Sequence, residues 1–101
     1  MPYPVVTPEP GVTRQVLSET PDMMLVAVGF AAGACGKPHS HHHVQATYVK
    51  SGRFTFTLDG VAHDLTPGDS LVIPSHVTHG CVCVEAGDLI DAFTPRRDDF
   101  L

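Results

Sequence analysis

The sequence is short of positive charge. Its 101 residues contain 6 Lys and Arg against 11 Asp and Glu, which gives a formal net charge of −5 with neutral histidine and a pI near 5.7. Proteins that bind the phosphate backbone of nucleic acid need a cationic surface. We therefore expect no nucleic-acid partner.

Long apolar runs are also lacking. Charge-free segments such as Met23–Gly36, which has 14 residues, fall short of the ~20 residues that a membrane helix needs. The N-terminus has neither the basic region nor the apolar region of a signal peptide. These features predict a cytoplasmic protein with no membrane partner.

Cysteine is scarce as well. The three cysteines are an odd number and too few for a disulfide scaffold. Cys81 and Cys83 are two positions apart in one predicted strand, where their side chains point the same way with poor geometry for a mutual bridge. A reducing compartment fits this pattern.

The length leaves room for one domain, since domains cluster near ~100–150 residues. With 43% hydrophobic and 17% charged residues, the chain has the composition of a globular protein with a packed core. Residues 1–12 are rich in proline, which favours extended backbone, and we expect an arm along a sheet edge or a neighbouring subunit. Residues 13–101 form the predicted domain, with a C-terminal tail over residues 95–101.

The pattern from residue 13 onward predicts an all-β fold. Runs of β-branched and aromatic residues alternate with turn residues, and we expect about eight antiparallel strands in a closed or nearly closed barrel. Phe54–Leu58 alternates strictly and ends in Asp59-Gly60, which predicts a two-residue hairpin into Val61. The predicted strands are Thr13–Glu19, Met23–Phe30, Ala46–Lys50, Phe54–Leu58, Val61–Thr66, Ser70–Ile73, His79–Glu85 and Leu89–Thr94.

Histidines gather in one short segment. Four of the seven lie between His39 and His43, and His79 begins a later predicted strand. Alternate residues of a strand share a face, so His39 and His41 are expected to point inward. Joined by His79, they would make a first-row transition-metal site. His43 would share their face, either as a ligand or as a neighbour of the ligands.

The spacing of these residues resembles the two sequence motifs of the cupin family. The first motif runs Gly, five residues, His-x-His, three or four residues, Glu, six residues, Gly. It is matched by Gly33, His39, His41, Gln45 and Gly52. The second motif is matched by Gly68, Pro74 and His79, 15 residues after the first. The resemblance implies a single-domain antiparallel jelly-roll barrel that binds one divalent metal ion (Ni, Zn, Fe or Mn). The implied ligands are His39, His41, Gln45 and His79.

Three positions depart from the cupin pattern. Gln45 replaces the usual Glu, His76 replaces a usual Gly, and Cys83 replaces a frequent Asn. Three imidazoles and an amide are neutral, so the charge of a divalent ion would stay uncompensated and would attract anionic substrate oxygens. Gln45 could coordinate the ion, or it could leave an open position for substrate. Cys81 and Cys83 are interpreted as small buried residues, with thiolate ligation as the alternative.

The C-terminus adds a second group of candidate residues. Leu89, Asp91 and Phe93 alternate onto one face of the last predicted strand. A buried carboxylate needs a partner, so Asp91 should be paired, poised for proton transfer, or not inward at all. Arg97 could fold over the cavity mouth and present its planar fork to a carboxylate. A salt bridge between Asp91 and Arg97 is the structural alternative.

The run from Asp91 to Leu101 resembles the C-terminal signature of small pectin-degradation cupins of the KdgF type. That resemblance implies conversion of cyclic 4,5-unsaturated uronates, from pectin or alginate breakdown, to their linear ketonic form. It assigns acid/base chemistry to Asp91, the carboxylate contact to Arg97 and the sugar-facing wall to Phe93. An iron- or copper-dependent dioxygenase and a non-catalytic module that binds a sugar acid or another small anion are the alternatives. A homodimer is expected, because a small cupin gains core by packing its outer sheet.

Overall fold

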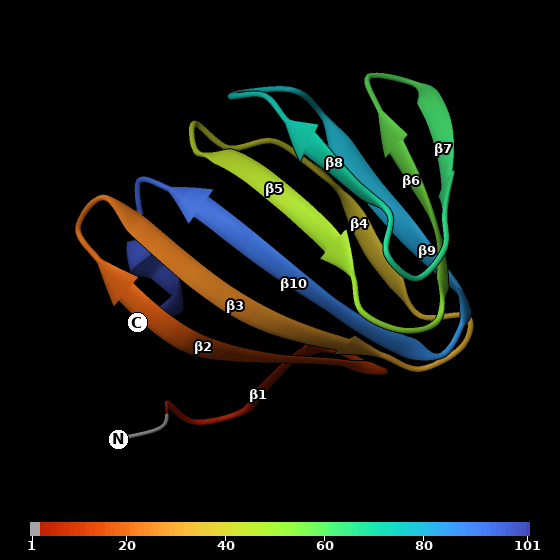
Figure 1. Ribbon diagram of the computed structural model, residues 1–101, viewed down its shortest axis with the longest axis horizontal. Helices are drawn as coiled ribbons and strands as arrows, with labels where there is room; N and C mark the ends of the chain where they lie inside the picture. Colours follow the sequence, from red (N-terminus) through yellow and green to blue (C-terminus); the bar gives the residue numbers. More distant parts are fainter. Residues whose placement is uncertain (1–2) are drawn as a thin grey trace.

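The computed structural model describes residues 3–101, which form ten strands and one short 3-10 helix (Figure 1). The strands form two antiparallel sheets, with the orders β1-β2-β3-β10-β5-β8 and β4-β9-β6-β7. This confirms the all-β jelly-roll prediction. Met1 and Pro2 of the predicted arm lie outside the described residues. The elements are β1 (Val6–Glu9), β2 (Val12–Thr20), β3 (Met23–Phe30), β4 (Cys35–His39), β5 (Val44–Val49), β6 (Arg53–Leu58), β7 (Val61–Leu65), β8 (Ser70–Ile73), β9 (His79–Glu85), β10 (Gly87–Thr94) and η1 (Asp98–Phe100).

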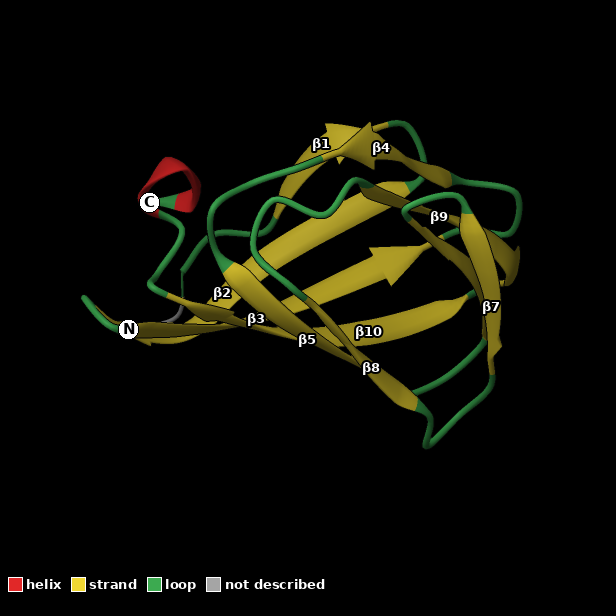
Figure 2. Cartoon of the chain, turned by 90° about the horizontal axis from the view of Figure 1, so that it is seen from above, coloured by secondary structure: helices red, strands yellow, loops and turns green. Residues whose placement is uncertain are grey.

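The two sheets face each other (Figure 2), and alternation along strands such as β5 and β10 turns one face of the strand to the interior. On β5, Gln45, Thr47 and Val49 are buried while the residues between them are exposed. The larger core cluster fills the space between the sheets with apolar side chains, and Phe30 and Phe54 meet there edge to face at 5.2 Å. Polar residues on the same inward faces are therefore the exceptions that need an explanation.

The predicted hairpin between Phe54–Leu58 and Val61 is confirmed. Asp59 and Gly60 have φ values of 47° and 81°, and Leu58 pairs with Val61 directly across the turn. Two consecutive positive φ values define the type of turn whose twist matches that of the flanking strands. The turn is thus set by two residues that tolerate the left-handed region.

Two strands of the structure were not predicted. β1 and β4 both contain proline and neither shows a clean alternation. Both are edge strands, so the missing N–H of Pro8 or Pro38 does not remove a hydrogen bond from the middle of a sheet. Their partners β2 and β9 hold them in place, which is a tertiary effect that local propensity does not report.

The two ends of the chain meet beside β2. β1 runs along the edge of the six-stranded sheet, one of the two places expected for the N-terminal arm. Glu19 accepts a hydrogen bond from the Tyr3 hydroxyl at 2.6 Å. It also forms an ion pair with Arg96 at 2.7 Å. The short helix η1 lies against β2, because the guanidinium of Arg14 on β2 stacks on the ring of Phe100 at 3.9 Å. Among residues 3–101, no helix is long and apolar enough to cross a membrane.

Candidate metal centre and substrate cavity

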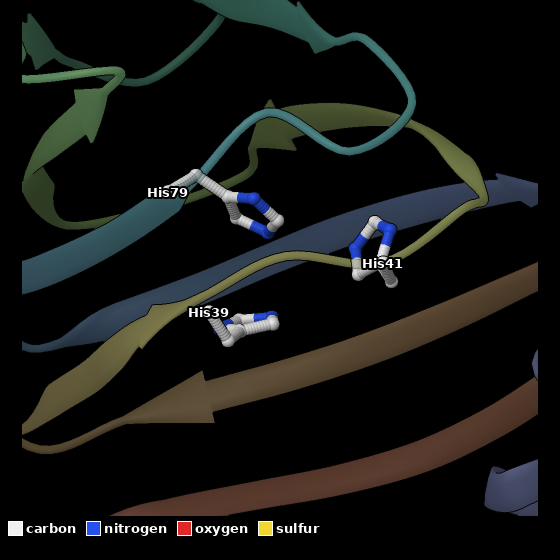
Figure 3. Close-up of side chains that lie close together, drawn as sticks. All are labelled: His39, His41 and His79. Atoms are coloured by element: carbon white, nitrogen blue, oxygen red, sulfur yellow. The ribbon is translucent and has the colours of Figure 1, made fainter.

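Three of the predicted imidazoles converge, with their rings close to one another (Figure 3). His39 ends β4 and His79 begins β9, and the two residues are paired in register. The ligand nitrogens of His39, His41 and His79 all lie within 4.8 Å of one another. The structure therefore brings together the three histidines that the motifs single out.

The alternation argument treated His39 and His41 as residues of one strand, which is wrong for His41 because β4 ends at His39. His41 belongs to the loop that leads to β5. The N–H of His76 donates to the His41 carbonyl at 2.7 Å, and the Ser75 hydroxyl donates to the carbonyl of His42. His76 has a φ of 65°, in the left-handed region that favours glycine, which is the residue cupins usually carry there. The loop is thus held by backbone contacts instead of by a sheet ladder.

Each ring of the three-histidine cluster is oriented by its own stretch of chain. In every case Nδ1 lies 2.8–3.0 Å from a backbone carbonyl two residues away. A carbonyl only accepts, so Nδ1 carries the proton and Nε2 keeps its lone pair. This is the usual way in which proteins orient metal-ligating histidines. The carbonyls belong to Lys37 for His39, to His43 for His41 and to Val77 for His79.

Two Nε2 atoms have surroundings suited to a cation. Within residues 3–101, the buried Nε2 of His79 has no hydrogen-bond partner. The Nε2 of His41 lies 3.1 Å from Oε1 of Gln45, and with Nδ1 protonated both atoms present lone pairs. A divalent ion satisfies all of these atoms together, and imidazole nitrogen is a preferred ligand of first-row transition metals. The donor set therefore fits such an ion.

A chain of hydrogen bonds leads from this cluster to Asp91. The amide of Gln45 donates to the Thr47 hydroxyl at 2.9 Å, and that hydroxyl donates to Oδ1 of Asp91 at 2.7 Å. Asp91 points inward with 7% of its surface exposed. The donation from Gln45 Nε2 to Thr47 leaves Oε1 facing His41. One network thus fixes both the amide and the carboxylate.

Burial changes the acid–base properties of these groups. Desolvation raises the pKa of Asp91 to about 6, although the hydrogen bonds with Thr47 and Gln45 act in the opposite direction. Desolvation also lowers the pKa of His41 and of His79. Neutral imidazoles at physiological pH are the form that binds metal ions.

All of the predicted site residues except His41 line one cavity of about 320 Å³. This volume lies within the range of small-ligand pockets, ~300–1,000 Å³. Apolar side chains such as Phe30, Phe56 and Leu89 line its inner part. The predicted site residues that line the cavity are His39, Gln45, His79, Asp91, Phe93 and Arg97.

Arg97 folds back over the cavity, as the sequence predicts. Its ion pair is with Asp99 and not with Asp91, the partner in the structural alternative. Its Nε and Nη2 donate to the two carboxylate oxygens of Asp99 at 3.0 and 2.9 Å, and no salt bridge joins it to Asp91. Its guanidinium lies 5.2 Å from the Phe93 ring centroid and 4.3 Å from that of Phe100. Tail residues two and three positions further on therefore hold Arg97 in place.

Other candidates lie outside the three-histidine cluster. His43 is buried and gives its carbonyl to His41, so it acts as a neighbour of the cluster. His76 is exposed and is not among the residues that line the cavity. Cys81 and Cys83 are free, buried and not among the clustered ligand atoms. Burial raises the pKa of the Cys81 thiol to about 12, which keeps it protonated.

The sequence reasoning missed three residues of the site. Thr47 lies on the same strand face as Gln45, so the alternation of β5 could have pointed to it. Asp99 and Phe100 lie in the tail, where a carboxylate two residues after Arg97 was available as a partner. No local pattern signals that Phe100 packs on Phe93, with ring centroids 5.7 Å apart.

Two antiparallel sheets around a three-histidine cluster are the features of a cupin, and a model of the cupin domain matches residues 26–90. The chain belongs to the cupin family. It is 41% identical over 93 residues to the pectin degradation protein KdgF of Dickeya dadantii (strain 3937), an alignment that covers 90% of this chain and 84% of that protein.

Solved structures agree with this placement. KdgF from Halomonas sp. matches with a TM-score of 0.92 and 46% identity, covering 98% of this chain and 92% of that one. An RmlC-like cupin from Shewanella frigidimarina NCIMB 400 matches with a TM-score of 0.94 and 42% identity, covering 98% and 89% of the two chains. The chain is thus similar to KdgF proteins over nearly its whole length.

Proposed function

We propose that this cupin is a metal-dependent enzyme that opens the ring of 4,5-unsaturated uronates from pectin or alginate breakdown. The observation that carries the proposal is one cavity that combines a neutral histidine–amide donor set, a buried carboxylate and a guanidinium. The name of the Dickeya relative, which places that protein in pectin degradation, supports the same substrate class.

The proposed metal ligands are His39, His41, His79 and the amide oxygen of Gln45. The ion is one divalent cation of the Ni, Zn, Fe or Mn type. When bound, it would supply Lewis acidity next to the cavity. Because all four donors are neutral, the charge of the ion is left to attract an anionic substrate.

The proposed reaction is an isomerisation that needs no oxidant. The anomeric hydroxyl loses its proton, a C1 carbonyl forms, and the bond from C1 to the ring oxygen breaks. The electron pair of that bond leaves as an enolate on the ring oxygen, and a proton added at C4 gives the ketone. One proton is removed and one is returned, so a single acid/base group suffices.

Asp91 is the proposed acid/base. Its carboxylate lines the cavity and is held by the Thr47 hydroxyl, so it can accept the anomeric proton and return it to C4. Phe93 provides an apolar wall for the sugar face, and Arg97 holds the uronate carboxylate. These roles are in keeping with a cavity that combines apolar side chains with a few polar and charged groups.

The test is proton NMR of a lyase-generated unsaturated monouronate, following the C4 vinylic proton. Metal-loaded protein should speed its disappearance over the spontaneous rate. Asp91→Asn should lower the rate constant by about 10²–10⁴-fold, the usual contribution of a general acid/base, with metal content unchanged. A rate equal to the spontaneous one, in protein that demonstrably holds metal, would overturn the proposal and direct attention to oxygen uptake or to binding alone.

We also propose that the chain forms a homodimer through the outer face of β5 and β8. Val44, Tyr48 and Val72 are 41%, 47% and 59% exposed there, and Ala46 pairs with Val72 in register. Apolar residues gathered on an outer face favour a protein contact. Sedimentation velocity at micromolar concentration should show a dimer, and Tyr48→Glu should give a monomer. A wild-type monomer would contradict this proposal.

A reducing cytoplasm is the proposed compartment. Cys35 is an exposed free thiol, and Cys81 and Cys83 are free as well. An exposed thiol persists where the surroundings keep it reduced. Thiol titration of protein taken directly from cell extract should count three reduced cysteines, and a mixed disulfide at Cys35 would contradict the assignment.

A further inference from the structure

Arg14 occupies an unusual position on β2. The strand alternates so that Val12 and Val16 are buried on its inward face, and Arg14 lies between them on that face, partly buried. An apolar residue is the ordinary occupant of such a position, because burying a charge costs free energy unless a partner compensates. Arg14 departs from this rule.

The Arg14 guanidinium has no such partner. Among residues 3–101 it makes no ion pair and no side-chain hydrogen bond, whereas Arg96 is paired with Glu19 and Asp98. The nearby carboxylate of Asp99 is engaged by Arg97 through both of its oxygens. The five N–H donors of Arg14 are thus available to a ligand.

The guanidinium is nevertheless held in place. It stacks on the ring of Phe100, with 3.9 Å between Cζ and the ring centroid. The same ring carries the Arg97 guanidinium at 4.3 Å. A guanidinium stacked on an aromatic ring keeps its edge free for in-plane hydrogen bonds. Arg14 also lines the cavity that contains Asp91 and Arg97.

Arg97 alone offers an incomplete grip on a carboxylate. Its Nε–Nη2 edge, which is one of the two edges that form paired hydrogen bonds with a carboxylate, is already occupied by Asp99. The Nη1–Nη2 edge of Arg97 remains for a ligand, while its side edge stays committed to Asp99. A second guanidinium would therefore add donors that Arg97 cannot supply.

We propose that Arg14 is a second carboxylate-binding residue of this cavity, which recognises the uronate carboxylate together with Arg97. The inference rests on the proposed function for its substrate class and extends it by a residue from the other end of the chain. Arg14 supplies the free fork, Arg97 supplies a fixed neighbouring charge, and Phe100 sets the spacing of the two guanidiniums.

The experiment compares an acid with its neutral counterpart. Isothermal titration of the metal-loaded protein with D-galacturonate and with its methyl ester measures how much the carboxylate contributes to binding. The wild type should prefer the acid, and Arg14→Gln should lower affinity for the acid by about tenfold, since hydrogen bonds between charged groups contribute that much or more. Affinity for the ester should change little. Arg14→Lys, which keeps the charge but lacks the fork, should recover only part of the loss.

Arg53→Gln is the matched control, because Arg53 is an exposed arginine on β6 that does not line this cavity. It should leave both affinities unchanged. Equal losses for acid and ester in Arg14→Gln would mean that the residue acts only on structure, and would overturn the proposal. So would a wild type that does not prefer the acid.

The same data separate this inference from the proposed function. If ring opening stays at the spontaneous rate while Arg14→Gln abolishes the preference for the acid, the carboxylate site stands and the enzymatic proposal fails. If ring opening is accelerated and Arg14→Gln leaves both KM and the acid preference unchanged, the reverse holds.

Discussion

The two ends of the cavity are built in different ways. At the metal end, neutral side chains are held by carbonyls only two residues away along the chain. At the mouth, the charged and aromatic groups come from β2 and from the C-terminal tail, and their contacts join opposite ends of the chain. The metal end is thus encoded locally, while the mouth exists only once the tail has docked on β2.

This difference has a chemical counterpart. The donor groups at the metal end are neutral, so the charge of a divalent ion bound there would stay uncompensated. The mouth uses guanidiniums, whose planar forks match the geometry of a carboxylate. Both ends would therefore attract an anionic ligand, and the buried carboxylate of Asp91 lines the same cavity.

The largest effect is expected from breaking the metal end. His79→Ala removes one of three clustered imidazoles, and metal affinity should fall by more than about 100-fold, since even changes to residues around a ligand cost about 10–100-fold. Metal analysis of the purified protein and the NMR assay measure this together. His63→Ala, at an exposed position on β7, is the control and should keep full metal content. Metal retention by His79→Ala would contradict the assigned ligand set.

A pH series tests the group between the two ends. The pKa of Asp91 is about 6 in the folded chain and near 3.9 when unfolded. Because folding raises it, Asp91 contributes stability that is fully present below pH ~4 and is lost as the pH rises through about 6. In chelated protein, Asp91→Asn should therefore raise the free energy of unfolding at pH 8 by up to about 3 kcal/mol relative to wild type.

Urea unfolding at pH 4, 6 and 8 measures this difference. The gain should shrink toward zero at pH 4, where the wild-type carboxyl is already protonated. Asp22→Asn, at an exposed turn, should show no such trend. A gain in the free energy of unfolding that is independent of pH would mean that it does not come from removing the buried negative charge of Asp91.

The smallest effect is expected from loosening the mouth. Asp99→Asn weakens the paired hydrogen bonds that fix Arg97, and KM should rise about tenfold with a smaller change in kcat, because the loss concerns positioning of a binding group. Steady-state kinetics on the unsaturated monouronate measure the split. Asp98→Asn is the neighbouring control, since Asp98 pairs with Arg96 instead. A lower KM in Asp99→Asn would show that Asp99 competes with the substrate for Arg97.

Much of the fold and of the metal end could be predicted from the sequence. The period of two decides which side chains face inward, so Leu89, Asp91 and Phe93 were assigned to one face and are all buried there. The Asp59-Gly60 turn and the spacing of His39 and His79 rest on equally local rules. These predictions succeeded because alternation, turn conformation and motif spacing act within a few residues.

The edge strands and the mouth were decided by tertiary structure. β1 and β4 have weak strand signals and form because a neighbouring strand offers its free edge. The place of Arg14 at the cavity depends on its stacking on Phe100, which comes from the far end of the chain. The physical reason is that a salt bridge or a stacked ring depends on which segments docking brings together. The sequence by itself determined the inward faces and the histidines that cluster, and only the folded chain decided which of the described charges are paired and which remain free.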